Sequence, residues 1–241
     1  MQTRIQKKVS PFSSNRLLDM LPRKDRERIV AGCEEVALTF SERISSPGAA
    51  IDHVHFPTGG FISILTSIPD GGQLEVALVG HEGMVGIPLV MGAGYSQSHA
   101  MVQGAGPALR MSTARFRREM SESPVFRKTL GNYLYARFGQ LARAAGCNRF
   151  HLVEARLARW LLMTSDRAQS GTFNITHGFL ASMLGVRRVG VTTAASALKR
   201  MKLIRYQRGS LEILDRDGLE RVACGCYRAD LETYAKALNG G

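Results

Sequence analysis

The sequence predicts an α+β fold in three parts: an antiparallel β-roll like a cupin jelly roll, one long helix, and a C-terminal domain of short helices with a β-hairpin. Three observations lead to this prediction. Short β-branched segments alternate with turn residues from about residue 35 to residue 111, an apolar stripe with helical spacing follows residue 124, and two short helical patterns precede a hairpin pattern. The expected parts are residues 1–123, 124–150 and 151–241.

Residues 15–32 are predicted to be helical. Asn15 can cap the first helix because its side-chain oxygen can accept a backbone N–H, and Pro22 suits the first turn of a second short helix. Leu17, Leu18 and Leu21 supply the apolar side of this segment.

Six segments between residues 36 and 112 have the β-branched or alternating pattern of short strands. Turns rich in Gly, Pro, Ser and Asp separate them, for example PTGG and IPDGG. The six segments are VALTF, AIDHVHF, GFISILTSI, QLEVALVG, MVGIPLV and PALRMS. Many short strands at this spacing favour an all-β sandwich, roll or barrel for this half of the chain.

A long helix is expected to follow. Ser112 can cap a short helix, TARFRREM, and Pro124 lies near the first turn of a helix that runs to about Arg149. Apolar residues recur along it at steps of three or four, the spacing of a coiled-coil seam. The seam residues are Leu130, Leu134, Phe138, Leu141 and Ala145. This seam can pack on its own domain or on a second copy of the helix, and we favour a dimer helix.

The C-terminal domain has the pattern of a winged helix-turn-helix. A helix is expected over residues 153–167, and ITHGFLASMLGVRRVGVTTAASALKRM predicts two more. Thr176 can cap the first of these two, and Gly185 suits the turn between them because glycine tolerates the left-handed conformation. IRYQRGSLEILD then predicts the hairpin, and DRDGLERVAC a last short helix. GVRRVG follows a helix and matches no phosphate-loop pattern.

Charge is distributed unevenly along the chain, whose net charge is +12. Residues 44–109 contain four acidic residues and no Lys or Arg, whereas residues 185–210 contain seven basic residues and no acidic one. A basic segment beside an acidic one favours a half that binds a polyanion and a half with another role.

The basic residues of the helix-turn-helix favour DNA as the polyanion. Arg187 and Arg188 begin the second helix, the end that meets base edges in such motifs, and arginine pairs well with guanine. Thr192 and Thr193 follow one turn later, and Arg205 and Arg208 on the hairpin suit phosphates. The predicted DNA-binding residues are Thr176, Arg187, Arg188, Thr192, Thr193, Lys199, Arg205 and Arg208.

This order of parts resembles the Crp/Fnr family of bacterial transcription regulators, most specifically over residues 175–214. The resemblance implies a roll that senses an effector, a homodimer held by the long helix, and a palindromic double-stranded DNA site. It also implies contact with RNA polymerase if the protein is an activator. By position, Arg188 matches the base-reading arginine of the family and Thr193 a second contact, while Val189 stands where the family often has glutamate.

The corresponding effector pocket departs from the cyclic-nucleotide pattern of the family. Ile87 replaces a glutamate, and Gln97 and Ser98 stand where arginine and serine hold the cyclic phosphate. A buried phosphodiester needs cations or dense hydrogen bonding, and the long helix offers only Arg127 or Arg137 as poor substitutes. We therefore expect no tight binding of cyclic AMP. The pocket candidates are Gly83, Met84, Gly86, Ile87, Gln97 and Ser98.

We expect no metal and no other cofactor. Four cysteines are too few for a disulfide framework or an N-terminal iron–sulfur site. Histidines at positions 53, 55, 81 and 99 show no axial haem pair, and a metal on them is not favoured. Cys224 and Cys226 are interpreted as structural cysteines in preference to a redox pair or half of a metal site.

The sequence therefore predicts a dimeric, sequence-specific transcription regulator with an unidentified effector. No nucleophile elbow, metalloprotease helix or Walker motif indicates an enzyme. The chain has no long apolar run and no secretory signal pattern, which favours the cytoplasm without membrane contact. The alternative is a ligand-binding or protein-interaction module with only nonspecific affinity for DNA.

Overall fold

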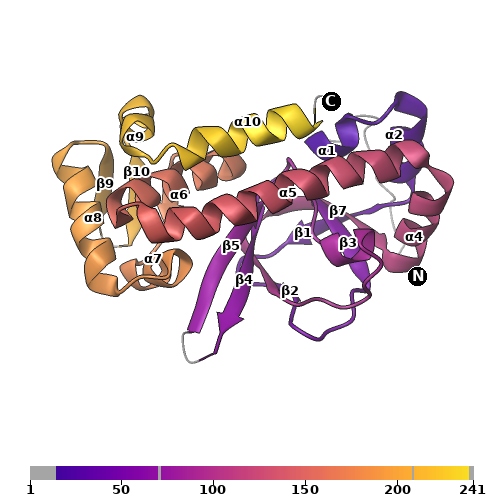
Figure 1. Ribbon diagram of the computed structural model, residues 1–241, viewed down its shortest axis with the longest axis horizontal. Helices are drawn as coiled ribbons and strands as arrows, with labels where there is room; N and C mark the ends of the chain where they lie inside the picture. Colours follow the sequence, from indigo (N-terminus) through magenta and orange to yellow (C-terminus); the bar gives the residue numbers. More distant parts are fainter. Residues whose placement is uncertain (1–14, 70–71, 208, 239–241) are drawn as a thin grey trace, which may run out of the picture.

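The protein consists of a β-roll and a smaller helical domain, with one long helix running along both (Figure 1). The computed structural model describes residues 15–69, 72–207 and 209–238. No helix in these ranges is long and apolar enough to cross a membrane. The α+β class and the order of parts agree with the sequence prediction.

Two short helices, α1 (Arg16–Asp19) and α2 (Arg23–Ala31), open the described chain. The predicted cap is present, because the Asn15 side chain accepts a hydrogen bond from the Leu18 N–H at 3.3 Å. The Asn15 amide also donates to the carbonyls of Pro57 at 2.8 Å and Gly83 at 2.9 Å. This buried side chain therefore fixes α1 to the roll.

The roll consists of two antiparallel sheets, ordered β1–β7–β3 and β2–β6–β4–β5. Buried apolar side chains from both sheets form one core, which includes Leu38, Ile62, Val102 and Ala108. The sheets therefore pack face to face. The strands are β1 (Glu34–Leu38), β2 (Arg43–Ser45), β3 (His53–Pro57), β4 (Phe61–Ile68), β5 (Gly72–Val79), β6 (His99–Gly104) and β7 (Gly106–Ser112).

The strand prediction for MVGIPLV is wrong, since this segment contains the short helix α3 (Ile87–Val90). Gly86 adopts a φ of 116°, which bends the chain away from an extended path. A Cβ atom at this position would lie 2.7 Å from Cγ1 of Val54, so the backbone approach also requires glycine. Pro88 then stands in the first helical turn, where its missing N–H costs no hydrogen bond. Strands β2 and β6 were not predicted.

Helix α4 (Thr113–Glu122) and the 27-residue helix α5 (Pro124–Phe150) begin at serine caps, of which Ser112 was predicted. The Ser112 hydroxyl accepts from the Arg115 N–H, and the Ser123 hydroxyl accepts from the Phe126 N–H. Hydroxyl caps satisfy backbone donors that a helix start leaves unpaired. Local sequence therefore determines where the long helix begins.

The C-terminal domain has the predicted helices and hairpin, plus one strand that pairs with the hairpin. Strand β8 was not predicted, and it makes the sheet three-stranded in the order β8–β10–β9. The elements are α6 (Val153–Ala168), β8 (Thr172–Asn174), α7 (His177–Leu184), α8 (Arg188–Arg200), β9 (Ile204–Gln207), β10 (Ser210–Ile213), α9 (Arg216–Val222) and α10 (Cys226–Leu238).

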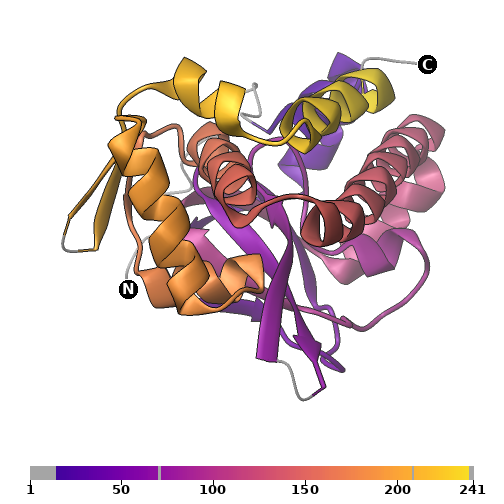
Figure 2. The ribbon, with the colours of Figure 1, turned by 60° about the vertical axis from the view of Figure 1, so that its left-hand side comes forward.

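Helix α10 leaves the C-terminal domain and returns along α5 toward α1, as Figures 1 and 2 show. Leu238 at its end is buried in the same core as Leu17 and Leu18. The sequence analysis predicted no helix beyond α9. Residues 226–238 therefore connect the C-terminal domain to the core that contains α1.

A second connection joins strand β5 to the C-terminal domain. The Glu75 carboxylate on β5 accepts from Nε1 of Trp160 at 2.7 Å and from the Ser63 hydroxyl at 2.6 Å. Nearby, Arg167 on α6 forms an ion pair with Glu82 at 2.7 Å, and both side chains are largely buried. These polar contacts hold the helical domain against the edge of the roll.

Candidate nucleic-acid interface and effector pocket

Gly185 forms the turn between α7 and α8. Its φ of 61° is left-handed, and the N–H of Val186 closes the turn on the Ala181 carbonyl at 3.0 Å. Val191, Ala194 and Leu198 then place one side of α8 in the core of the C-terminal domain. The opposite side of α8 is thereby turned to solvent.

Five residues at the start of α8 form its exposed surface. Arg187 is the N-cap residue, and the side chains of Arg188, Thr192 and Thr193 are exposed near it. Val189 lies among them and is 68% exposed, which is high for an apolar side chain. The Thr192 and Thr193 hydroxyls each donate to the carbonyl one turn earlier at 3.1 Å. Arg187 and Arg188 therefore lie at the N-terminal end of an exposed surface whose side chains make few contacts within the protein.

Thr176 and Lys199 lie at the margins of this surface. The Thr176 hydroxyl caps α7 by accepting from the Phe179 N–H at 3.1 Å. Lys199 is exposed in the last turn of α8, about 16 Å along the helix from Arg188.

His177 and Tyr206 join the hairpin to the two helices, and the sequence analysis missed both. Their rings stack with centroids 4.5 Å apart and planes 17° apart, and Nδ1 of His177 lies 3.0 Å from the Thr192 hydroxyl. The Tyr206 hydroxyl donates to the Ile175 carbonyl at 2.7 Å. Burial and the charge of Arg188 lower the pKa of His177. No sequence motif marks this pair, because it depends on the packing of the hairpin.

Two hairpin residues, Arg205 and Arg208, were predicted to bind DNA, and the structure describes only Arg205. Arg205 is exposed on β9 and forms an ion pair with Glu212 of β10 at 2.6 Å, so part of its charge is offset. Arg208 lies outside the described residues.

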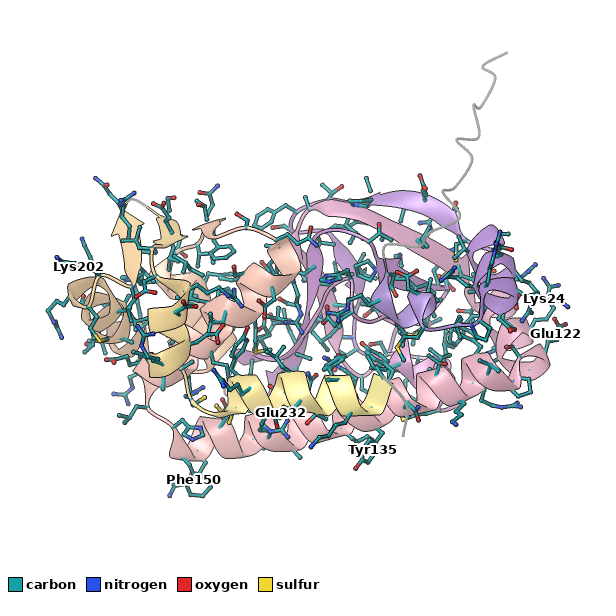
Figure 3. All side chains as sticks on the ribbon, turned by 90° about the horizontal axis from the view of Figure 1, so that it is seen from above. Lys24, Glu122, Tyr135, Phe150, Lys202 and Glu232 are labelled. Carbon is teal, nitrogen blue, oxygen red and sulfur yellow. The ribbon has the colours of Figure 1, made fainter. Side chains whose placement is uncertain are left out.

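The predicted seam of α5 divides into a buried end and an exposed end. Leu130 is fully buried in its own domain, and Leu134 is half-buried. Phe138 is 64% exposed, and Leu141 is exposed one turn later. Tyr135 and Phe150 project outward from the same helix (Figure 3). This apolar surface has the periodicity of a helix seam without a partner helix among the described residues.

A cavity of about 530 Å³ opens in the roll beside α5. Five of the six predicted pocket residues line it, whereas Gly83 does not and instead lies against the Tyr133 ring. Phe138 and Leu141 of α5 complete the lining, so the cavity and the exposed seam share side chains. The five predicted residues in the lining are Met84, Gly86, Ile87, Gln97 and Ser98.

Three arginines from segments distant in the sequence also line this cavity. They are Arg43, Arg110 and Arg137, and the first two flank the segment without Lys or Arg. Arg137 is 4% exposed and donates to the Leu78 carbonyl at 3.1 Å and to the Gln140 side chain at 2.8 Å. Arg110 pairs with Glu34 at 2.7 Å. Arg127, the other predicted substitute, is exposed and is not in the lining.

Histidines lie in the same cavity. His53, His55 and His99 are in its lining, and the rings of His53 and His55 are 6.5 Å apart. Burial lowers the pKa of His55 to about 4, with the charge of Arg110 as the next cause, so this ring is neutral at pH 7. The cavity is thus lined by aliphatic and hydroxyl side chains, three histidines, the carboxylates of Glu42 and Asp52, and three arginines of which two already have partners.

Residues 155–222 match the family model of the Crp-like helix-turn-helix domain. This chain carries a Crp-like helix-turn-helix domain. The match covers α6 to α9, including the turn at Gly185 and the exposed start of α8. A comparison with curated proteins finds no match.

Solved structures extend the likeness of the Crp-like domain to most of the chain. The global regulator CLP of Xanthomonas campestris, described as c-di-GMP responsive, is 17% identical over 80% of this chain and 99% of its own, with a TM-score of 0.65. FixK2 of Bradyrhizobium japonicum is 13% identical over 80% and 98%, with a TM-score of 0.67. A CRP/FNR-family regulator of Thermus thermophilus is 22% identical over 79% and 98%, with a TM-score of 0.65. The fold is that of Crp/Fnr transcription regulators.

Proposed function

We propose that this protein is a homodimeric transcription regulator that binds a palindromic DNA site and responds to an effector in the roll. The observation that carries the proposal is the exposed start of α8, where Arg187 and Arg188 stand on a Crp-like helix-turn-helix. In such motifs the N-terminal residues of the second helix enter the major groove. Arg188 reads a guanine, and Arg187, Lys199 and Arg205 contact phosphates.

Dimerisation is supported by the exposed apolar surface of α5. A coiled-coil seam repeats every three or four residues, and Phe138, Leu141 and Ala145 follow this repeat toward the exposed end of the helix. Two copies packed on this surface would bury the aromatic and aliphatic side chains that one copy leaves in water. A two-fold dimer presents two α8 helices, which requires half-sites about one helical turn apart.

An effector in the cavity would contact the helix that holds the dimer. Phe138 and Leu141 belong both to the cavity lining and to the seam, so occupancy of the cavity can alter helix packing directly. A contact that differs between two arrangements of the helices is what couples a ligand to DNA affinity. The chemistry of the cavity favours an effector other than cyclic AMP.

Selection of binding sites from random double-stranded DNA tests the proposed function. The purified full chain is expected to enrich a palindromic consensus with half-sites about one turn apart. Binding should weaken steeply as salt concentration rises, because phosphate contacts release counterions. A pool without enrichment, together with salt-sensitive binding to any duplex, would instead support a module with nonspecific DNA affinity.

A further inference from the structure

Four potential metal ligands converge where the long helix ends and the last helix begins. Cys147 and His151 are one turn apart at the end of α5, and Cys224 and Cys226 lie at the start of α10. One sulfur or nitrogen atom from each residue lies within 4.8 Å of the others. His151 and Cys224 are far apart in the sequence, so tertiary packing alone creates this group.

The spacing of the ligand atoms fits one tetrahedral metal ion. With Zn–S of about 2.3 Å and Zn–N of about 2.0 Å, neighbouring ligands of a tetrahedral site lie about 3.5–3.8 Å apart. Sγ of Cys147 is 3.5 Å from Sγ of Cys224, and Sγ of Cys226 is 3.6 Å from Nδ1 of His151. A multinuclear cluster would hold its ligands farther apart. All three thiols are free.

The surroundings of the cluster suit a buried anionic complex. The three cysteines are buried together against Ala155, while His151 is exposed and closes the outer side. The Arg159 guanidinium lies 3.8 Å from Sγ of Cys147. Three thiolates around a divalent ion carry one net negative charge, which this guanidinium offsets.

Arg159 is itself held in place by Asp230 of α10. It donates to one carboxylate oxygen of Asp230 at 2.6 Å, and Arg143 of α5 donates to the other at 2.5 Å. Asp230 is 4% exposed, so these are largely buried ion pairs. The charged residues around the cluster therefore join the same helices as the cluster itself.

We propose that Cys147, His151, Cys224 and Cys226 bind one zinc ion as a closed Cys₃His site. Binding replaces three thiol protons, which are released to solvent, and leaves the imidazole neutral with Nδ1 on the metal. No coordination position remains for water or substrate, so the ion is structural. It links the end of α5 to the start of α10 and so holds α10, the helix that packs against both domains, in place. This proposal differs from the sequence-based expectation of no metal.

Metal analysis of the untagged full-length protein tests the site. Protein purified under reducing conditions without chelators is expected to contain one equivalent of zinc per chain by mass spectrometry of the metal. Removal of zinc with a chelator and addition of Co²⁺ should give the visible absorption of tetrahedral cobalt with thiolate ligands. The variants Cys226→Ser and His151→Asn should lose most of the metal.

Cys33→Ser is the matched control, because Cys33 lies between α2 and β1 and its thiol contacts only the Ile29 carbonyl among the hydrogen bonds described. It should retain a full equivalent of zinc. If a ligand variant fails to fold, release of zinc from the wild-type protein still tests the site, because a chromogenic zinc indicator can follow the release. Increased amide exchange in α10 should accompany that release.

Several outcomes would overturn the proposal. Substoichiometric zinc without cobalt bands, iron with inorganic sulfide, a Cys147–Cys224 disulfide that excludes metal, or equal loss of zinc in Cys33→Ser would each do so. None of these measurements uses DNA, so a negative result for the zinc site can be distinguished from a failure of the proposed function.

Discussion

Arg188 is the residue on which the proposed DNA specificity depends. It is exposed at the start of α8, beside Arg187, and a bidentate contact from an arginine to guanine discriminates against other bases. Arg188→Ala should lower affinity for the selected site by about 1–3 kcal/mol and relax the preference at one base position. Equilibrium titrations of fluorescent duplexes measure this effect. The control is Arg118→Ala, because Arg118 is exposed on α4, far from α8 in the sequence, and this variant should leave affinity unchanged. Equal binding by Arg188→Ala and wild type would show that Arg188 does not read a base.

Val189 is the second residue that should influence the site. Its exposed apolar side chain can contact a thymine methyl group, whereas a carboxylate accepts from the amino group of cytosine. Val189→Glu is therefore expected to shift the preference at one position from thymine to cytosine. Selection from random DNA with the variant measures the shift. Val189→Ala serves as control and should not create a cytosine preference, so an unchanged consensus in Val189→Glu would place this side chain away from the bases.

Ionisation of Glu75 should make the free energy of unfolding depend on pH. Burial raises its pKa from 4.5 to about 7, and the Ser63 and Trp160 hydrogen bonds and the charges of Arg167 and Arg159 offset only part of this effect. The folded protein then holds the proton more tightly than the unfolded chain. The resulting stability is complete below pH 4.5 and is lost as pH rises through 7, by at most about 3 kcal/mol.

Urea denaturation across this pH range tests the Glu75 contribution. Glu75→Gln keeps an acceptor for Trp160 and cannot ionise, so its stability relative to wild type should rise between pH 4.5 and 7. A difference in free energy of unfolding that stays constant with pH would show that Glu75 does not titrate in this range.

At the scale of elements, α5 is the part with two roles. Its buried side supports the roll through Leu130 and Tyr133, while Phe138 remains exposed on the seam. Phe138→Asp places a charge where a partner helix would pack and should convert a dimer to monomers. Light scattering and sedimentation measure the mass, and affinity for the full palindrome should fall far more than affinity for one half-site.

Phe40→Asp is the control for the seam variant, because Phe40 is 59% exposed in the turn after β1. It should leave the oligomeric state unchanged. A Phe138→Asp protein that remains dimeric would place the dimer contact on another surface.

At the scale of the whole molecule, the cavity decides which effectors the roll can take. Three arginines reach the lining, of which Arg137 and Arg110 already have partners. The carboxylates of Glu42 and Asp52 belong to the same lining and would repel an anion, and Ile87 presents an aliphatic side chain. Desolvation of a phosphodiester would therefore be poorly offset. Calorimetric titration with cyclic AMP and with cyclic di-GMP is expected to show no micromolar binding. Micromolar affinity for either nucleotide would contradict this expectation.

The order of elements was predictable because it depends on short-range chemistry. Serine and threonine hydroxyls cap the helices that they precede, and Gly185 adopts the left-handed turn that its sequence context suggested. The prediction was wrong at MVGIPLV, where an aliphatic run resembles a strand but Gly86 and Pro88 start a helix. It also missed the strands β2, β6 and β8 and the helix α10. Caps, turns and periodicity act over a few residues and can be recognised in the sequence.

The sites depend on contacts between segments far apart in the chain. A count of charges over residues 44–109 could not show that Arg43, Arg110 and Arg137 meet at the cavity. Likewise, the pair Cys224 and Cys226 gains Cys147 and His151 only when α10 packs back along α5. Local hydrogen bonding and hydrophobic spacing sufficed for the helix-turn-helix and its exposed arginines. The cavity and the cysteine–histidine cluster required the folded chain, because distant side chains converge only after the core has excluded water.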